Sequence, residues 1–205
     1  HCAAYTRVDD AESDPDGAAE LNAVSTRYVA AAAANAGAVF VYPSTDYVFD
    51  GAASVPYAPD SPTAPLSVYG SSKLAGEAAA AFAERHHVVR TSWLYGVGGA
   101  NFVSTMMKRA RAGTPLRVVD DQRGTPTWTA DLAPMMLSLL ERNAPSGVWH
   151  AASTGDTTWF GFAQAILFVA ATVMGSINGS PQPAQDPIDI DLRDDAVVRR
   201  NDLDD

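Results

Sequence analysis

The sequence contains a single cysteine, Cys2, among its 205 residues. One cysteine excludes an internal disulfide framework and a cysteine-based zinc site, and it is typical of proteins from a reducing compartment. The sequence also lacks a basic segment followed by an apolar stretch near its start, so no signal peptide is visible. Its longest apolar run, residues 162–174, is broken by Gln164 and is too short to span a bilayer. We therefore expect a cytoplasmic protein that does not insert into a membrane.

Positive charge is scarce as well. Lysine and arginine total 14 against 24 aspartates and glutamates, which gives a formal net charge of −10. The imbalance lies at the two ends, because residues 1–20 and residues 186–205 carry −5 each and the residues between them are neutral. A nucleic-acid-binding protein would show a basic stripe, so we expect no nucleic-acid partner. With 47% hydrophobic and 19% charged residues, the composition is that of a globular chain able to bury a core.

Helical and extended patterns alternate along the chain. Helical spacing of apolar residues predicts helices over 18–35, 66–85, 101–111, 130–142 and 158–174, the fourth of them capped by Thr129. Short apolar runs rich in β-branched residues predict strands over 38–42, 87–93, 116–120 and 147–152. This alternation predicts an α/β fold with a doubly wound parallel sheet. A loop rich in Gly, Pro, Asp and Ser occupies residues 44–65, and connections of this length are often functional.

Lysine occurs only twice in the sequence, at Lys73 and Lys108, against twelve arginines. Lys73 follows Tyr69 by four residues, which on a helix places the phenol and the ammonium on one face. An ammonium beside a phenol would lower the tyrosine pKa from about 10 toward the working pH of a general acid. Such a pair also arises by chance, so the spacing by itself is only suggestive.

Hydroxyl groups follow the first predicted strand. Ser44 and Thr45 come directly after residues 38–42, at the carboxyl edge of the sheet where α/β proteins bind ligands. These hydroxyls could hold a substrate carbonyl oxygen while Tyr69 gives it a proton. The alternative is that Ser44, Thr45 and Asp46 only cap a turn. His86 and His87 lie beside Arg85, and no nearby acidic or cysteine partner completes a metal-ligand set, so we expect no metal site.

Several blocks of the sequence together resemble a known family. They are CAAYTRVDDAES (2–13), STDYVFDG (44–51), PLSVYGSSKLAGE (65–77), RTSWLYG (90–96), NFV (101–103) and VVDDQRGTPTW (118–128). In this order and at these separations, over roughly residues 1–165, they resemble the extended short-chain dehydrogenase/reductases, and within them the dTDP-4-dehydrorhamnose reductase family. Several blocks in register are far more specific than one Tyr-Lys pair.

The resemblance implies a catalytic triad of Thr45, Tyr69 and Lys73. Tyr69 would donate a proton to the C4 ketone of a dTDP-4-dehydro sugar, Thr45 would polarise that oxygen, and NADPH or NADH would supply the hydride. Lys73 would tune Tyr69 and hold the nicotinamide ribose. The product expected is dTDP-L-rhamnose, made from dTDP-4-dehydro-L-rhamnose. A homodimer is also expected.

The resemblance also assigns residues to the two ligands. Ala4, Tyr5 and Thr6 match the family's cofactor loop, so with Tyr69 and Lys73 they are the expected cofactor-binding residues. Val8, Asp46 and Trp93 match positions near the sugar nucleotide, so with Thr45 they are the expected substrate-binding residues. Without the resemblance, Val8 would be read as a core residue and Trp93 as a packing residue.

The sequence departs from the family at both ends. The family opens with a strand, a Gly-rich turn and a helix that receive the cofactor pyrophosphate, and we find none of them before His1. At the other end, Asp186 stands where the family has an arginine. We therefore expect a fragment: a Rossmann-like sheet that lacks its first βαβ unit and has a small C-terminal substrate-binding part. We expect this fragment to bind cofactor weakly and to fold poorly on its own. Residues 1–115 would be a partial dinucleotide-binding domain with the catalytic helix, 116–179 a mixed substrate-binding and sheet-completing region, and 180–205 an acidic disordered tail.

Three alternative functions stay open at this point. One is a reductase for a related dTDP-keto sugar, because the same triad serves any such ketone and specificity lies in pocket shape. Another is a non-catalytic regulatory relative, such as a methionine adenosyltransferase regulatory subunit. The third is a decayed gene product without activity. Retention of both Tyr69 and Lys73 favours an enzyme.

Overall fold

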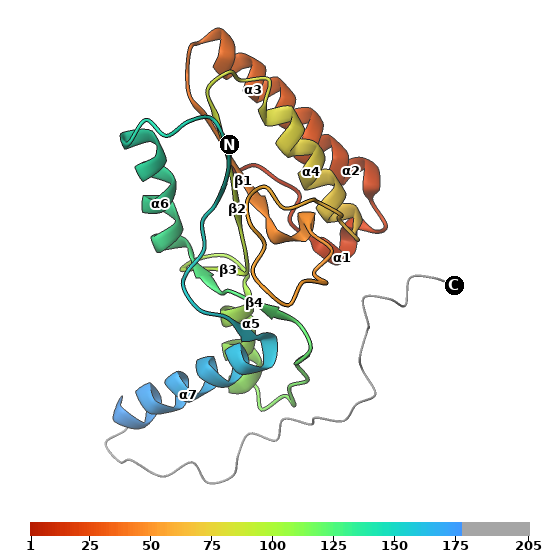
Figure 1. Ribbon diagram of the computed structural model, residues 1–205. Coiled ribbons are helices and arrows are strands. Elements are labelled where there is room, and N and C mark those ends of the chain that lie inside the picture. Colours follow the sequence, from red (N-terminus) through yellow and green to blue (C-terminus); the bar gives the residue numbers. More distant parts are fainter. Residues whose placement is uncertain (178–205) are drawn as a thin grey trace. The chain divides into compact units, whose positions relative to one another are not determined.

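The computed structural model describes residues 1–177, and the side chains up to Thr172. The chain divides into two compact units (Figure 1). The first unit comprises His1–Ser92 and Thr127–Ser153, and the second comprises Trp93–Pro126 and the described residues from Thr154 to Ile177. The predicted division at residues 115 and 179 stays a prediction, and the predicted acidic tail, 180–205, lies outside the described residues.

The first unit is built on a parallel sheet of three strands. These are β1 (Phe40–Thr45), β2 (His86–Thr91) and β6 (Gly147–His150), in the spatial order β1-β2-β6. Phe40 is paired with His86 and His87 with Gly147, and both pairings are parallel. Val88 and Val89 are almost fully buried, which accounts for the apolar run of β2. The predicted α/β class with a parallel sheet is confirmed.

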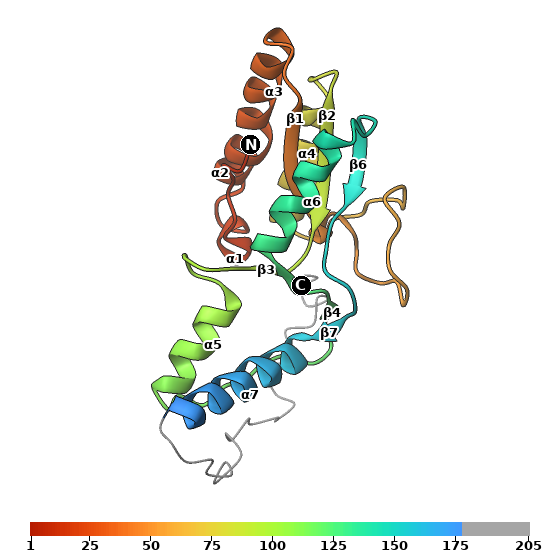
Figure 2. The same ribbon diagram turned by 90° about the vertical axis from the view of Figure 1, so that its left-hand side faces the viewer.

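Helices cover both faces of this sheet. Those of the first unit are α1 (Val8–Ala11), α2 (Pro15–Ala19), the π-helical turn η1 (Glu20–Val24), α3 (Ser25–Asn35), the short 3₁₀ turn η2 (Asp46–Val48), α4 (Val68–Ala80) and α6 (Thr129–Glu141), with the short strand β5 (Thr127–Trp128) before α6. Figures 1 and 2 both show α3 and α4 on one face of the sheet and α6 on the other. The core between the sheet and α3 and α4 combines aromatic side chains of β1 with alanines of the helices, including Phe40, Tyr42, Ala30 and Ala80.

Helix α4 is the element that places the predicted catalytic side chains. It begins after Ser67, whose Oγ accepts a hydrogen bond from the Gly70 backbone N–H at 3.0 Å. Near its other end, a Cβ on Gly76 would come closer than 3.0 Å to the Tyr42 hydroxyl and to the Asn22 carbonyl oxygen. A glycine at this position therefore lets α4 lie directly against β1 and η1.

The second unit has its own core. Its elements are β3 (Leu94–Tyr95), α5 (Phe102–Arg111), β4 (Arg123–Gly124), β7 (Thr157–Thr158) and α7 (Trp159–Ile177). Met106 of α5, Leu116, and Ala163, Ile166 and Leu167 of α7 form a buried apolar cluster. Strands β4 and β7 of the same unit pair antiparallel, Arg123 with Thr158 and Gly124 with Thr157.

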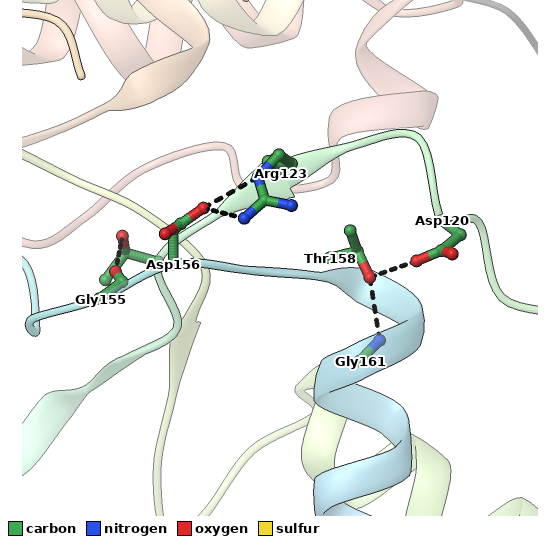
Figure 3. Close-up of polar contacts among 7 residues, drawn as sticks. Asp120, Arg123, Gly155, Asp156, Thr158 and Gly161 are labelled. Carbon is green, nitrogen blue, oxygen red and sulfur yellow. Dashed lines mark hydrogen bonds and ion pairs between the residues drawn. The ribbon is translucent and has the colours of Figure 1, made fainter. Parts of the chain in front are cut away.

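Polar contacts hold the β4–β7 pair and the start of α7 (Figure 3). Arg123 forms an ion pair with Asp156, and the Thr158 hydroxyl donates to Asp120. The Thr158 Oγ1 also accepts a hydrogen bond from the Gly161 backbone N–H at 3.0 Å. Thr158 therefore satisfies one of the free N–H groups at the beginning of α7.

Three details of the predicted secondary structure are wrong. Residues 116–120 do not form a strand, because Leu116 makes only an isolated bridge while its side chain anchors the core of the second unit. Thr129 does not cap α6; the helix begins with Thr129 itself, after Trp128, and has no side-chain cap. Helix α4 ends at Ala80 rather than at Arg85, since the N–H groups of Phe82 and Ala83 turn back to Ala79 and Ala80 before β2 begins. No helix among residues 1–177 combines the length and apolarity needed to cross a membrane.

Candidate active site

Thr45 and Tyr69, which lie 24 positions apart in the sequence, meet at the carboxyl end of β1. Thr45 is the last residue of β1 and Tyr69 is the second residue of α4, and the Thr45 side chain lies close enough to the Tyr69 phenol to lower its pKa. The Thr45 Oγ1 also accepts from the Tyr47 backbone N–H at 3.2 Å and donates to Asp46 Oδ1 at 3.0 Å. Thr45 thus caps the following turn and also contacts the phenol of Tyr69.

The Tyr69 phenol lies in largely apolar surroundings. Its ring meets the Tyr47 ring edge to face at 5.6 Å between centroids, and it packs against the buried cluster of Tyr5, Ala11 and Ala18. Burial raises the pKa of Tyr69 to about 12, the hydrogen bond with Thr45 lowers it in part, and the charge of Asp46 raises it further. Tyr69 therefore carries its proton at neutral pH, as a proton donor must.

The direction of this pKa shift is opposite to the one expected from sequence. A nearby ammonium was predicted to lower the Tyr69 pKa, but the largest influence is burial of the phenol. Lys73 lies one helical turn further along α4, and its Nζ is directed at β1: it donates to the Pro43 carbonyl oxygen at 2.7 Å. The same Nζ lies 4.0 Å from the centroid of the Tyr42 ring.

Lys73 is itself a buried cation, with only 4% of its surface exposed. Burial lowers the pKa of Lys73 to about 8, while the nearby Glu77 and Cys2 act to raise it. With a pKa of about 8 the ammonium is still mostly charged at neutral pH. The triad therefore combines a protonated phenol, a hydroxyl that contacts it and a fixed cation on the same helix.

The predicted cofactor segment, Ala4 to Thr6, is tied to this helix through Asn22. The Tyr5 N–H donates to Asn22 Oδ1 at 2.9 Å, and Asn22 Nδ2 donates to the Tyr5 carbonyl oxygen at 3.1 Å and to Ser72 Oγ at 2.9 Å. Ala4, Tyr5 and Thr6 line a hollow of about 360 Å³ together with Arg7, Asp14, Gly17, Glu20 and Leu21. Sequence reasoning missed Asn22, although an asparagine inside an alanine-rich helix is a signal of a buried polar contact.

The predicted substrate residues are divided between the two units. Asp46 and Val8 belong to the first unit: Asp46 begins η2 beside Thr45, and the half-buried Val8 begins α1. Trp93 belongs to the second unit, where its ring stacks on Trp159 at 3.7 Å between centroids. Trp93 also has a positive φ of 48°, a conformation that bulky residues rarely adopt.

Sequence reasoning also missed a buried ion pair behind Thr45. Glu77 of α4 and Arg90 of β2 form two hydrogen bonds, Arg90 Nε to Oε1 at 2.9 Å and Arg90 Nη2 to Oε2 at 2.7 Å. The Ser44 hydroxyl donates to Glu77 Oε1 at 2.6 Å, so it serves this pair, whereas the Thr45 hydroxyl is the one beside Tyr69. The signal available in the sequence was an arginine within the apolar run of β2 and a glutamate among the small residues at the end of α4.

Comparison with known proteins shows that this chain is similar to dTDP-sugar reductases over most of its length. A dTDP-4-dehydrorhamnose reductase from Streptomyces griseus is 47% identical over 165 residues, which is 78% of this chain and 54% of that protein. A probable dTDP-4,6-dihydroxy-2-methyloxan-3-one 4-ketoreductase from Streptomyces antibioticus is 46% identical and covers 82% of this chain and 57% of its own length.

The fold has a similar counterpart among solved structures. A dTDP-4-dehydrorhamnose reductase from Bacillus anthracis, in complex with NADP, superposes with a TM-score of 0.80 at 44% identity, over 83% of this chain and 60% of that one. The predicted Rossmann-like fold class is thereby confirmed. The chain spans between 54% and 60% of the length of these three relatives. The model of the RmlD substrate binding domain matches residues 1–200, and the chain therefore belongs to that family.

Proposed function

We propose that this chain carries the catalytic residues of a reductase that uses NADPH to convert dTDP-4-dehydro-L-rhamnose to dTDP-L-rhamnose. The observation that carries the proposal is that Thr45 ends β1 and Tyr69 lies at the start of α4 close enough for Thr45 to lower the Tyr69 pKa, with Lys73 one turn along the same helix. The names of the Streptomyces griseus and Bacillus anthracis relatives support the choice of substrate.

The proposed roles follow from the protonation states of the triad. Tyr69 donates its phenolic proton to the C4 oxygen of the sugar, because the raised pKa of about 12 keeps that proton in place until the oxygen becomes basic. Thr45 holds the same oxygen through its hydroxyl and so withdraws electron density from the carbonyl carbon. The Lys73 ammonium stabilises the tyrosinate that remains, and Tyr69 later recovers a proton from solvent.

The residues near the hollow fit a dinucleotide cofactor. Ala4, Tyr5 and Thr6 line this hollow, and Asn22 fixes their backbone to the helix that carries Tyr69 and Lys73. When bound there, NADPH would supply the hydride that adds to the C4 carbon as the carbonyl electron pair moves to oxygen. NADP in the Bacillus anthracis relative supports NADPH over NADH.

A turnover assay tests the proposal. The chain is mixed with NADPH and dTDP-4-dehydro-L-rhamnose, and both the loss of NADPH absorbance and the dTDP-sugar product are measured. We expect Tyr69→Phe to lower kcat roughly a hundredfold or more, because it removes the proton donor and leaves the ring in place. Tyr57→Phe is the matched control, since this hydroxyl contacts Asp50 rather than the triad. Equal turnover of the Tyr69→Phe variant and the parent would refute the assigned role.

A second candidate substrate is a related dTDP-keto sugar. The Streptomyces antibioticus ketoreductase is nearly as similar to this chain as the rhamnose enzyme is, and its name describes a different keto sugar. The same assay with a dTDP-4-keto-6-deoxyhexose of another configuration distinguishes the two. The larger kcat/KM identifies the substrate, and no turnover with either sugar would contradict the reductase assignment.

The proposal extends to location and assembly. We infer a cytoplasmic protein, supported by the single cysteine, and a homodimer, supported by large apolar side chains that are exposed on η1, on α3 and after α4. Among these are Leu21, Tyr28 and Phe82, of which Tyr28 is 70% exposed. Light scattering during size-exclusion chromatography measures the mass, and a monomer mass at assay concentration would contradict the dimer.

A further inference from the structure

The Glu77–Arg90 ion pair is almost completely enclosed by the first unit. Glu77 is 7% exposed and Arg90 is 6% exposed. Both carboxylate oxygens of Glu77 are used by Arg90, and Oε1 also receives the Ser44 hydroxyl. A charge pair with this degree of burial is weak evidence for stability alone, because desolvation of the two ions offsets most of their attraction.

The pair joins three elements that meet at the triad. Ser44 is the residue before Thr45 on β1, and Glu77 lies one helical turn after Lys73 on α4. The bond from Ser44 to Glu77 therefore fixes the strand end that carries Thr45 to the helix that carries Tyr69 and Lys73. Arg90 completes the connection from β2.

Arg90 also reaches the long loop after η2. Its Nη1 donates to the Pro59 carbonyl oxygen at 3.1 Å, and its guanidinium lies 5.0 Å from the centroid of the Phe49 ring. Phe49 in turn stacks on Tyr57 at 4.2 Å between centroids. The Arg90 guanidinium thus contacts Glu77, the Phe49 ring and the Pro59 carbonyl at the same time. The single point charge of a lysine could not make these contacts together.

Glu77 also acts on the triad through its charge. The groups that face the Lys73 ammonium are Glu77 on its own helix, the Tyr42 ring on β1 and Cys2 on the N-terminal segment. Of these groups, Glu77 has the largest influence in raising the pKa of Lys73 against the effect of burial. The carboxylate is therefore placed to keep Lys73 protonated as well as to hold the strand end.

We propose that Glu77, clamped by Arg90 and Ser44, is a positioning residue for the triad, which aligns Thr45 with Tyr69 and faces Lys73 with a fixed negative charge. The inference rests on the proposed function for its effect on turnover. The effect of Glu77 on the titration of Lys73 does not depend on substrate or cofactor. The effect on turnover and the effect on this titration can therefore be measured separately.

The titration of Lys73 gives the test that is independent of activity. The chain has two lysines, so isotope-labelled lysine in a Lys108→Arg background leaves a single side-chain NMR signal, that of Lys73. In the double variant Glu77→Gln/Arg90→Gln neither member of the ion pair is left as a charge without its partner, and Lys73 loses the carboxylate that faces it, so we expect Lys73 to titrate at lower pH than in the parent. Ser44→Ala keeps both charges, and Glu84→Gln removes an exposed carboxylate outside α4, so neither should move this titration.

Turnover gives the second measurement. We expect kcat to fall roughly ten- to a hundredfold in the Glu77→Gln/Arg90→Gln variant with little change in KM, because the reacting groups are misaligned while substrate contacts remain. Ser44→Ala should lower kcat with an unmoved Lys73 titration, and Glu84→Gln should leave kcat unchanged. Circular dichroism confirms that each variant is folded before it is compared.

The outcomes separate the two proposals. Absence of turnover in the parent chain would overturn the proposed function. The Lys73 titration would still show whether Glu77 raises the pH at which Lys73 titrates. If Lys73 titrates at the same pH in the folded double variant as in the parent, or if kcat is the same in both, the positioning role is overturned. A lower titration pH together with a lower kcat supports it.

Discussion

At the scale of single residues, burial shifts the pKa values of two side chains of the candidate site in opposite directions. Burial keeps Tyr69 protonated by raising its pKa to about 12, and it weakens the charge of Lys73 by lowering its pKa to about 8. Both shifts disfavour the charged form of the group. Tyr69 therefore keeps its proton at neutral pH, and Glu77 and Cys2 partly offset the effect of burial on the charge of Lys73.

The Lys73 shift predicts how stability depends on pH. Between pH 8 and pH 10.0 the unfolded chain binds more protons at this lysine than the folded chain does, so the free energy of unfolding rises with pH in this interval. The lowered pKa values of His87 and His150 act below pH 6.5, and the raised pKa values of Tyr42 and Tyr69 reduce stability only above pH 10.0. We expect urea unfolding of the parent to show this rise.

Replacing the lysine tests whether Lys73 causes the rise. Lys73→Met removes the titrating group, so the free energy of unfolding should become nearly independent of pH over the same interval. Lys108→Met is the matched control, because Lys108 is exposed on α5 and its loss should preserve the rise. A parent that loses stability between pH 8 and pH 10.0 would show that Lys73 is not the dominant group.

At the scale of elements, α4 is held against β1 and η1 by a close approach at Gly76. We expect Gly76→Ala to destabilise the protein by about 1–3 kcal/mol, because a methyl group at this position collides with the Tyr42 hydroxyl and the Asn22 carbonyl. The better helix propensity of alanine, about 1 kcal/mol, offsets only part of this. Urea unfolding measures the change.

A second variant locates the collision. Tyr42→Phe removes one of the two colliding atoms, so Gly76→Ala should cost less in the Tyr42→Phe background than in the parent. Ala78→Gly, on the exposed side of α4, measures the propensity effect by itself. An alanine at position 76 that raises stability would mean that the helix and strand can separate at no cost.

Elements with a strong local pattern could be predicted from sequence, and those that depend on distant contacts could not. The apolar runs of β1 and β2 and the helical spacing of α4 gave elements of the right type close to the right residues. Residues 116–120 have the same apolar, β-branched pattern as a strand, but Leu116 is needed in the core of the second unit, and within residues 1–177 the run makes only the isolated bridge at Leu116. Pairing is a tertiary property that a local pattern does not contain.

At the scale of the whole molecule, the proximity of Thr45 and Tyr69 could be predicted only from the topology of the fold. A hydroxyl at a strand end and a phenol at a helix start meet because β1 and α4 are consecutive parts of a parallel α/β unit. The Tyr69 pKa was predicted in the wrong direction, because its sign depends on the burial of the phenol and on where the Lys73 Nζ points. Asn22, Glu77 and Arg90 were missed for a similar reason, since their partners lie far away in the sequence.

The division into two units with separate cores predicts that their stabilities can be changed one at a time. Leu116 is 1% exposed in the core of the second unit, and Val89 is fully buried in the sheet of the first. Leu116→Ala should cost about 2–5 kcal/mol and raise amide hydrogen exchange in α5 and α7, because the cavity lies among their side chains. Val89→Ala is the reciprocal variant and should raise exchange in β1, β2 and β6. If Leu116→Ala instead accelerated exchange equally in β1 and β2, both units would unfold as one cooperative body, and the separate cores would not act as separate sources of stability.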